Sequence, residues 1–273
     1  FGSRRVLYRA LRPPALHPAR LRHVQRSLVL MAAMRDIAWR LELAAARGSD
    51  EHVMEEIAQH LEHQEEGVRY AAVWAMARVA PPSAEHAVAA IERRLQSEDW
   101  RTRRAAVEAM AKIAPCGGKR VADLIVRRIE DEDERVRLVA VEALAEVIPY
   151  GDARALEAIA LRLEHEREGV RRSALEAMAR LAGAGDARAM GLVAKRFAHK
   201  RASVRRTAVE AMVRFAPRGD VKAMEAIVQR LADEDSTVRS VAALAMAAVA
   251  PRAMLKPVRG TIAQVSAAGV LPQ

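Results

Sequence analysis

Histidines and carboxylates gather early in the chain, in an arrangement that approaches the spacing of metal ligands. His52, Glu56, His60 and His63 fall within one stretch of helical periodicity. A zinc site needs three or four ligands that converge on a single tetrahedral point. His52 and His60 are about two helical turns apart, too far for one site without a ligand between them. We therefore expect a solvated helix face here, with no metal and no cofactor.

The chain has one cysteine, which is the next candidate for chemistry. Cys116 lies beside Gly117-Gly118, where we expect a loop between two helices, and the surrounding 34-residue unit contains no histidine to activate a nucleophile. A single thiol cannot form an internal disulfide, so the sequence indicates an intracellular, reducing compartment. No window reaches the ~18 apolar residues of a membrane span. We predict no catalytic residue and no enzyme activity.

Tyr70 and Trp74 are the side chains best suited to contact a partner. The equivalent residues in other copies of the repeat described next are Arg and Glu. Exposed aromatic side chains on a charged helix face are typical of partner contacts. The alternative is that both pack beneath the N-terminal segment or the irregular first repeat. We expect Trp39 to be a core residue, whereas Trp100, at a junction between repeats, could either pack or bind.

A strict 34-residue repeat must position all of these residues. Its apolar positions fall three or four residues apart, as on one face of an α-helix. Each copy is predicted to hold two helices, because Pro or Gly ends the first helix and the Asp of a Gly-Asp pair caps the second. With position 1 set at Val68 and its equivalents, position 2 is arginine throughout. These residues are Arg35, Arg69, Arg103, Arg137, Arg171, Arg205 and Arg239.

The repeated arginine follows an acidic tract in several copies, such as Asp131-Glu132-Asp133. We therefore predict a structural ladder, in which each guanidinium pairs with carboxylates or helix-end carbonyls at the joint between repeats. A side chain present in every copy is expected to serve packing, whereas a binding site appears once. The predicted fold is an all-α solenoid of about seven two-helix repeats over residues 34–250, with a degenerate tail at 251–273.

The net charge of +10 comes from the two ends of the chain. Residues 1–35 and 251–273 contain basic residues and no acid, so the repeats between them are close to neutral. Along the exposed ridge of the Arg-bearing helices, Arg and Glu alternate at i, i+4, as in Arg104-Glu108 and Arg206-Glu210. Such alternation is typical of a solvated face and not of a groove that follows phosphates.

Residues 1–33 form a basic N-terminal arm of different character. Its composition resembles an organellar transit peptide, which favours a mitochondrion over a plastid. If the arm is retained, we expect it to dock on RNA, anionic lipid or an acidic protein. A basic tail without a role is the alternative. The arginines expected to make such contacts are Arg4, Arg5, Arg9, Arg12, Arg22 and Arg26.

The two-helix unit, with its Arg, its acidic tract and its AVEAM-type core, resembles short HEAT repeats over roughly residues 34–250. More narrowly, it is similar to the HEAT-like repeats of phycobilisome lyases. The motifs of tetratricopeptide and ankyrin repeats are missing. The HEAT-type enzyme deoxyhypusine hydroxylase would show paired His-Glu dipeptides in both halves, and this chain has only His165-Glu166. The resemblance implies an extended binding surface rather than a catalytic cavity.

The leading prediction is a non-enzymatic scaffold or adaptor that binds other proteins through its solenoid surface, as an accessory subunit of a large organellar complex. One alternative is an organellar RNA-associated or ribosomal factor that uses the basic arms. A second, implied by the resemblance, is a bilin lyase-like chaperone. That function requires an apolar cleft with aromatic side chains and a carboxylate.

Overall fold

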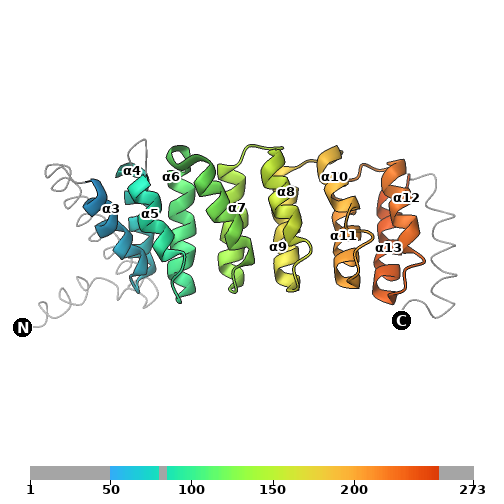
Figure 1. Ribbon diagram of the computed structural model, residues 1–273, viewed down its shortest axis with the longest axis horizontal. Helices are drawn as coiled ribbons and strands as arrows, with labels where there is room; N and C mark the ends of the chain where they lie inside the picture. The colour runs from blue at the N-terminus through green and yellow to red at the C-terminus, as the bar shows by residue number, and fades with distance from the viewer. Residues whose placement is uncertain (1–49, 80–84, 252–273) are drawn as a thin grey trace, which may run out of the picture.

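The computed structural model describes residues 50–79 and 85–251, which form helices stacked side by side along one long axis (Figure 1). Within these ranges the secondary structure is helical throughout, with no strand. One set of helices carries the repeated arginine: α4 (Glu66–Val79), α6 (Trp100–Arg127), α7 (Glu134–Val147), α9 (Glu168–Leu181), α11 (Ala202–Phe215) and α13 (Ser236–Val249). The other set is α3 (Asp50–Gln59), α5 (Glu85–Arg94), α8 (Ala153–Arg162), α10 (Ala187–Ala194) and α12 (Val221–Arg230), with 3-10 turns at His60–Glu62 and Arg128–Glu130. The predicted all-α solenoid is confirmed.

Aspartate side chains cap the N-terminal ends of α8, α10 and α12. Asp152, Asp186 and Asp220 each accept the backbone N–H three residues later at 2.8 Å. These amides have no partner inside the helix, so the carboxylate satisfies them and favours the helix start. The Gly-Asp pairs of the sequence predicted all three caps.

The glycine before each of these caps fixes the turn between the two helices of a repeat. Gly151, Gly185 and Gly219 have φ angles of 78°, 84° and 85°, a region that residues with a Cβ rarely adopt. In this conformation the Gly185 N–H donates to the carbonyl of Phe215 at 2.7 Å, and the other two make the equivalent bond at the same distance. Each turn is thereby joined to the end of the next Arg-bearing helix.

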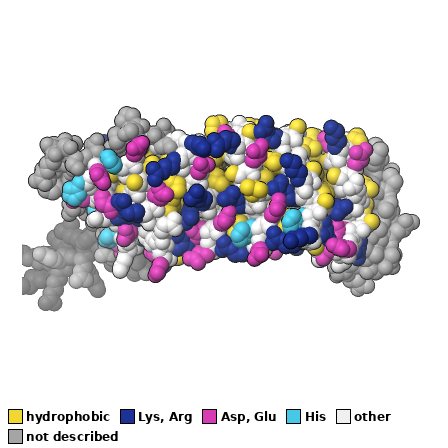
Figure 2. All heavy atoms as spheres, viewed as in Figure 1, with side chains coloured by type: hydrophobic (Ala, Val, Ile, Leu, Met, Phe, Trp, Pro, Cys, Tyr) yellow, Lys and Arg dark blue, Asp and Glu magenta, His cyan; other side chains and the backbone are white. Residues whose placement is uncertain are grey.

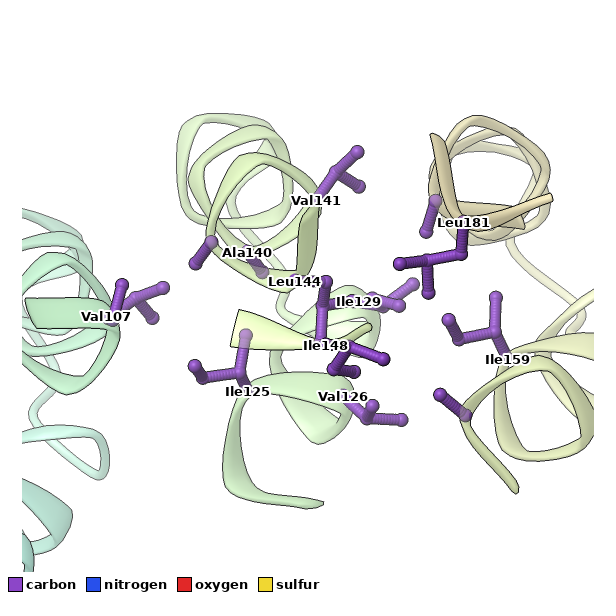
Figure 3. Packing of buried hydrophobic residues seen from close by; sticks show 14 of the residues in the cluster. Val107, Ile125, Val126, Ile129, Ala140, Val141, Leu144, Ile148, Ile159 and Leu181 are labelled. Carbon is purple, nitrogen blue, oxygen red and sulfur yellow. The ribbon is translucent and has the colours of Figure 1, made fainter. Parts of the chain in front are cut away.

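The core runs the length of the stack between the two sets of helices. Figure 3 shows Ile129, Leu144 and Ile148 close together between neighbouring helices, and all three are buried. Each Arg-bearing helix contacts the next one along the chain. Fully buried alanines such as Ala174 leave room for this close approach.

Neighbouring Arg-bearing helices run parallel. Arg206 pairs with Glu168 at 2.8 Å, and two turns further along Arg214 pairs with Glu176 at 3.3 Å. Both pairs join residues 38 positions apart, so the register between α9 and α11 is constant along their length. The Arg and Glu side chains that alternate along this ridge therefore also form ion pairs between neighbouring repeats. Figure 2 shows basic and acidic side chains interspersed over the face in view.

The break between two helices that the sequence predicted beside Cys116 is a kink at Gly118, with φ 50° and ψ −137°. The helical segments on either side of this kink together make up α6, which ends at Arg127. No Gly-Asp pair follows Pro115, so the aspartate cap that starts a separate second helix in later repeats is missing. Glycine tolerates the left-handed φ at which the chain turns instead.

Several sequence predictions fall outside the described residues. They concern the basic arm at 1–33, Arg35, Trp39 and the tail from 252 onward. The number of repeats and the strictness of their period over 34–250 also remain predictions. No helix in the described ranges is long and apolar enough to cross a bilayer.

Candidate partner-binding site

A pocket of about 510 Å³ lies between α4 and the first half of α6. We call it the aromatic groove. Both helices carry the repeated arginine and run side by side, so the groove follows their axes. Val73 and Ala105 form its buried floor. The remaining lining residues are Glu66, Arg69, Tyr70, Trp74, Trp100, Arg101, Arg104, Glu108 and Lys112.

Tyr70 and Trp74 form one side of the aromatic groove. Their ring centroids are 6.1 Å apart and the ring planes meet at 67°, an edge-to-face arrangement that favours each ring's present orientation. Tyr70 is 49% exposed and Trp74 is 43% exposed. Large aromatic side chains held in place and half exposed are suited to binding, because little side-chain entropy remains to be lost. Their contact with a partner stays a prediction.

Trp100, which the sequence left open, forms the opposite side of the aromatic groove. Its indole is partly buried against the core and contacts two guanidinium groups. Arg101 is 4.9 Å from the ring centroid and Arg135 is 4.2 Å from it. The cation–π contact with Arg101 holds that cation in the groove lining. A signal was present in the sequence, because Trp100 replaces the glutamate found at the same repeat position as Glu134.

The charges around the aromatic groove are unevenly distributed. Arg104 Nε is 2.9 Å from Glu108 and its Nη1 is 3.9 Å from Glu66, so one guanidinium engages both lining carboxylates. Arg101, whose side chain is 53% exposed, has a longer contact of 3.5 Å to Asp99. The groove lining also includes Arg69 and Lys112, so it contains four basic residues and two carboxylates.

The repeated arginines make the same backbone contacts in every described copy. Nη1 of each one donates to the two carbonyls five and six residues earlier, at 2.6 to 3.1 Å. These carbonyls belong to the turn that follows the preceding helix or its 3-10 turn, where backbone acceptors lack an intrahelical partner. The six arginines concerned are Arg69, Arg103, Arg137, Arg171, Arg205 and Arg239.

Contacts to residues further along the chain differ from copy to copy. Arg103 donates from Nε and Nη2 to Asp131, at 2.9 Å in both cases, and Arg205 does the same to Asp233 at 2.9 and 2.7 Å. These hydrogen bonds raise the pKa of both arginines. Arg171 instead donates to the Thr207 hydroxyl at 3.2 Å, and burial lowers its pKa. That this ladder sets the register between repeats stays a proposal.

A second repeat position is also occupied by arginine in five copies, and the sequence analysis did not identify it. We call these residues the second arginine column. Three members reach a carboxylate of the preceding repeat: Arg94 lies 2.8 Å from Glu62, and Arg162 and Arg196 make the equivalent pairs. The other two donate to a backbone carbonyl of the preceding repeat, Arg128 to Leu95 at 2.8 Å and Arg230 to Phe197 at 3.0 Å. The same period that revealed the first column could have revealed this one. Its members are Arg94, Arg128, Arg162, Arg196 and Arg230.

The histidines singled out in the sequence make local hydrogen bonds. His60 Nδ1 donates to the Glu56 carbonyl at 2.8 Å, and the Nδ1 atoms of His63 and His165 each accept a backbone N–H two residues later at 3.0 Å. In the part of the chain that the structure describes, no three His, Cys, Asp or Glu side chains are grouped as metal ligands.

Comparison with known proteins identifies the repeat. A family model described as HEAT repeats matches residues 54–145, 93–179, 121–213 and 156–247. No curated protein matches the chain. Among solved structures, importin beta has a TM-score of 0.46 at 16% identity, over 72% of this chain and 30% of that one. A designed armadillo repeat protein in complex with the peptide (KR)4 has a TM-score of 0.35 at 18% identity, over 72% and 99% of the two chains. At these values the likeness indicates nothing about function.

Proposed function

Because this chain belongs to the HEAT-repeat family, we propose that it is a non-enzymatic scaffold that binds another protein through the aromatic groove. Solenoids of this kind typically mediate protein binding through extended surfaces. The observation that carries the proposal is the pair Tyr70 and Trp74, two half-exposed rings in edge-to-face contact at positions where several other repeats carry paired Arg and Glu.

The position of the two rings within the repeat supports a contact role. They occupy positions 3 and 7, where Arg206 and Glu210 illustrate the usual occupants. Those usual residues pair with each other and with the neighbouring repeat. Neither packing nor solubility of the solenoid therefore requires aromatic side chains at these positions. Aromatic residues of this kind are enriched among the residues that dominate binding energy.

The experiment restores the usual residues of the repeat. We expect Tyr70→Arg with Trp74→Glu to abolish copurification of the native partner, because the two largest apolar contacts are lost. Loss of one anchoring aromatic costs about 2 kcal/mol or more of binding free energy, roughly a 30-fold weakening. The measurement is quantitative mass spectrometry of proteins recovered with the tagged chain.

The matched control is a double variant that changes repeat positions 3 and 7 in other copies of the repeat. Leu138 stands at position 3 and Leu244 at position 7, and both are exposed. Leu138→Arg with Leu244→Glu makes the same chemical change away from the aromatic groove, and we expect it to leave partner recovery unchanged. Equal losses in the two double variants, or no loss in either, would refute binding through the aromatic groove.

We further propose that the partner belongs to a large organellar complex of which this chain is an accessory subunit. The basic arm at residues 1–33 is the motivation, since its composition suits targeting or docking. Native gel migration of the endogenous protein tests this: a position at the mass of the free chain would contradict it. The RNA-associated alternative rests on the same arm and predicts salt-sensitive RNA retention that is lost on deleting residues 1–33.

One observation favours a second candidate, the bilin lyase-like chaperone. The aromatic groove combines Tyr70, Trp74 and Trp100 with the carboxylates of Glu66 and Glu108, in a volume of about 510 Å³. This volume lies within the usual range of small-molecule sites. A lyase-like chaperone would retain visible absorbance when mixed with an open-chain tetrapyrrole and desalted. Absence of pigment in the wild-type chain would exclude this candidate.

A further inference from the structure

We propose that the aromatic groove takes an extended acidic peptide segment, with two apolar side chains on Tyr70 and Trp74 and a carboxylate at Arg101. This inference rests on the proposed function and specifies its partner. The predicted partner segment has its three contact residues at alternate positions. A carboxylate stands at position i, and apolar side chains stand at i+2 and i+4, in this order or the reverse.

The spacing follows from the geometry of the two chains. Tyr70 and Trp74 are one helical turn apart, which is about 6 Å along the axis of α4. An extended peptide advances about 6.6 Å in two residues, and its alternate side chains point to the same side. Two apolar side chains at i and i+2 therefore match the two rings. A peptide helix would present side chains at i and i+4 on a much wider body, which an open groove between adjacent helices accommodates poorly.

The position of the carboxylate follows from the register of α4 and α6. The repeat places Arg101 one position before the start of its unit and Tyr70 at the third position, a difference of three residues. Because the helices of this set run parallel, Arg101 lies about 4.5 Å further toward their N-terminal ends than Tyr70. This offset is within reach of a side chain two residues along an extended peptide. The Arg101 guanidinium is held against the Trp100 ring, at 4.9 Å from its centroid.

Charge complementarity favours an acidic segment over a basic one. Arg104 already engages Glu66 and Glu108, at 3.9 and 2.9 Å. Arg101 is 53% exposed, and the exposed Arg135, 4.2 Å from the Trp100 ring centroid, adds a second positive charge nearby. A nucleic acid fits less well, because each nucleotide adds a phosphate and the ridge beyond the aromatic groove alternates acid and base.

The test uses the full chain and defined peptides measured by fluorescence anisotropy. The acidic probe is fluoresceinyl-Glu-Ser-Leu-Ser-Phe-amide, together with the reversed order Phe-Ser-Leu-Ser-Glu. The comparison probes replace Glu by Lys, or replace Leu and Phe by Ser. We expect one order of the acidic probe to bind about tenfold more tightly than its Lys form, because charge reversal exchanges an attraction for a repulsion. The Ser form should bind at least about tenfold more weakly than the acidic probe.

Two variants with matched controls assign the contacts. Trp74→Glu should weaken binding of the acidic probe by about tenfold or more, whereas Leu244→Glu, at the same repeat position, should not. Arg101→Glu should abolish the preference for Glu over Lys. Its control is Arg188→Glu, since Arg188 is also 53% exposed and also has one weak ion pair, 3.7 Å to Glu157.

Equal or tighter binding of the Lys probe would overturn the inference, as would tighter binding of an oligo-dT hexamer or no binding of either acidic probe. A photo-cross-linking residue at position 74 separates this failure from failure of the proposed function. If it captures the native partner while the acidic probes show no preference, the scaffold function stands and the peptide class is wrong. If it captures no protein, the scaffold function itself fails.

Discussion

Arg205→Ala tests whether the repeated arginine stabilises the joint between repeats. The Arg205 side chain is 6% exposed and its partner Asp233 is 2% exposed, so the pair is screened from water. Nε and Nη2 bond both carboxylate oxygens, and Nη1 bonds the carbonyls of His199 and Lys200. The substitution leaves a buried carboxylate with weaker contacts, to Arg230 at 3.3 Å and to the Asp235 N–H at 3.0 Å.

The expected loss in the free energy of unfolding follows from the buried Asp233 carboxylate, which the substitution leaves without its main partner. Breaking a buried ion pair by removing one partner costs about 3–5 kcal/mol, because the remaining charge stays buried. The residual contacts of Asp233 place the expected loss near the lower limit, at about 3 kcal/mol. Arg171→Ala leaves only neutral groups, two carbonyls and the Thr207 hydroxyl. We expect it to cost about 1–2 kcal/mol.

Urea unfolding followed by circular dichroism at several temperatures measures the difference. For a solenoid of this size, each kcal/mol corresponds to about 2–4 °C in Tm, so the two variants should be separated by several degrees. Arg214→Ala is the control, since its side chain is 53% exposed and it pairs with Glu176 at 3.3 Å. We expect it to cost less than about 0.5 kcal/mol. If Arg205→Ala is no more destabilising than Arg171→Ala, the buried-carboxylate reasoning is refuted.

Three further predictions concern pH, a turn and the second arginine column. Burial alone would raise the pKa of Asp233, but hydrogen bonds from Arg205 and the Asp235 N–H, with the charges of Arg205 and Arg230, lower it below the usual 3.8. Its stabilisation is thus present above pH 3.8 and lost as pH falls through the lower folded pKa, so Asp233→Asn should flatten the acid side of a stability–pH curve. Gly185→Ala, at φ 84°, should cost about 1–2 kcal/mol in urea unfolding, whereas Gly191→Ala within α10 should stabilise by up to about 1 kcal/mol. Gln96→Glu adds the carboxylate that pairs with this column in other repeats and should stabilise by about 0.5 kcal/mol at low salt.

Local features of the sequence were sufficient to predict the solenoid's helices. Apolar spacing, proline and the Gly-Asp pairs each act within a few residues, so they can be recognised without knowledge of the partner helix. Asp186 caps α10 as expected for this reason. Beside Cys116 one of these signals is incomplete, and the break between the two helices is a kink at Gly118. Proline stood at the expected position, but the aspartate that starts the next helix did not follow.

Contacts between repeats were less accessible to sequence reasoning. An acidic tract precedes several of the repeated arginines, which suggested carboxylates or helix-end carbonyls as partners at each joint. The carboxylate that meets the guanidinium lies 28 positions later for Arg103 and Arg205, at the far end of the same 34-residue unit. At that distance Arg137 and Arg171 have His165 and His199 instead of aspartate. Carboxylate pairing therefore depends on long-range register, and the tract beside each arginine supplies mainly its backbone carbonyls.

The candidate site illustrates how departures from a repeat can be informative when they coincide in space. Tyr70 and Trp74 replace usual residues in one repeat, and Trp100 replaces a glutamate at the start of the next. In sequence, Trp100 is separated from the other two and could not be assigned to binding or packing. In the structure all three line one groove, because α4 and α6 are adjacent and parallel. Substitutions confined to packing would be expected to turn inward, whereas Tyr70 and Trp74 remain half exposed. The shared groove is thus the strongest reason to place binding there and the repeated arginines in the structural framework.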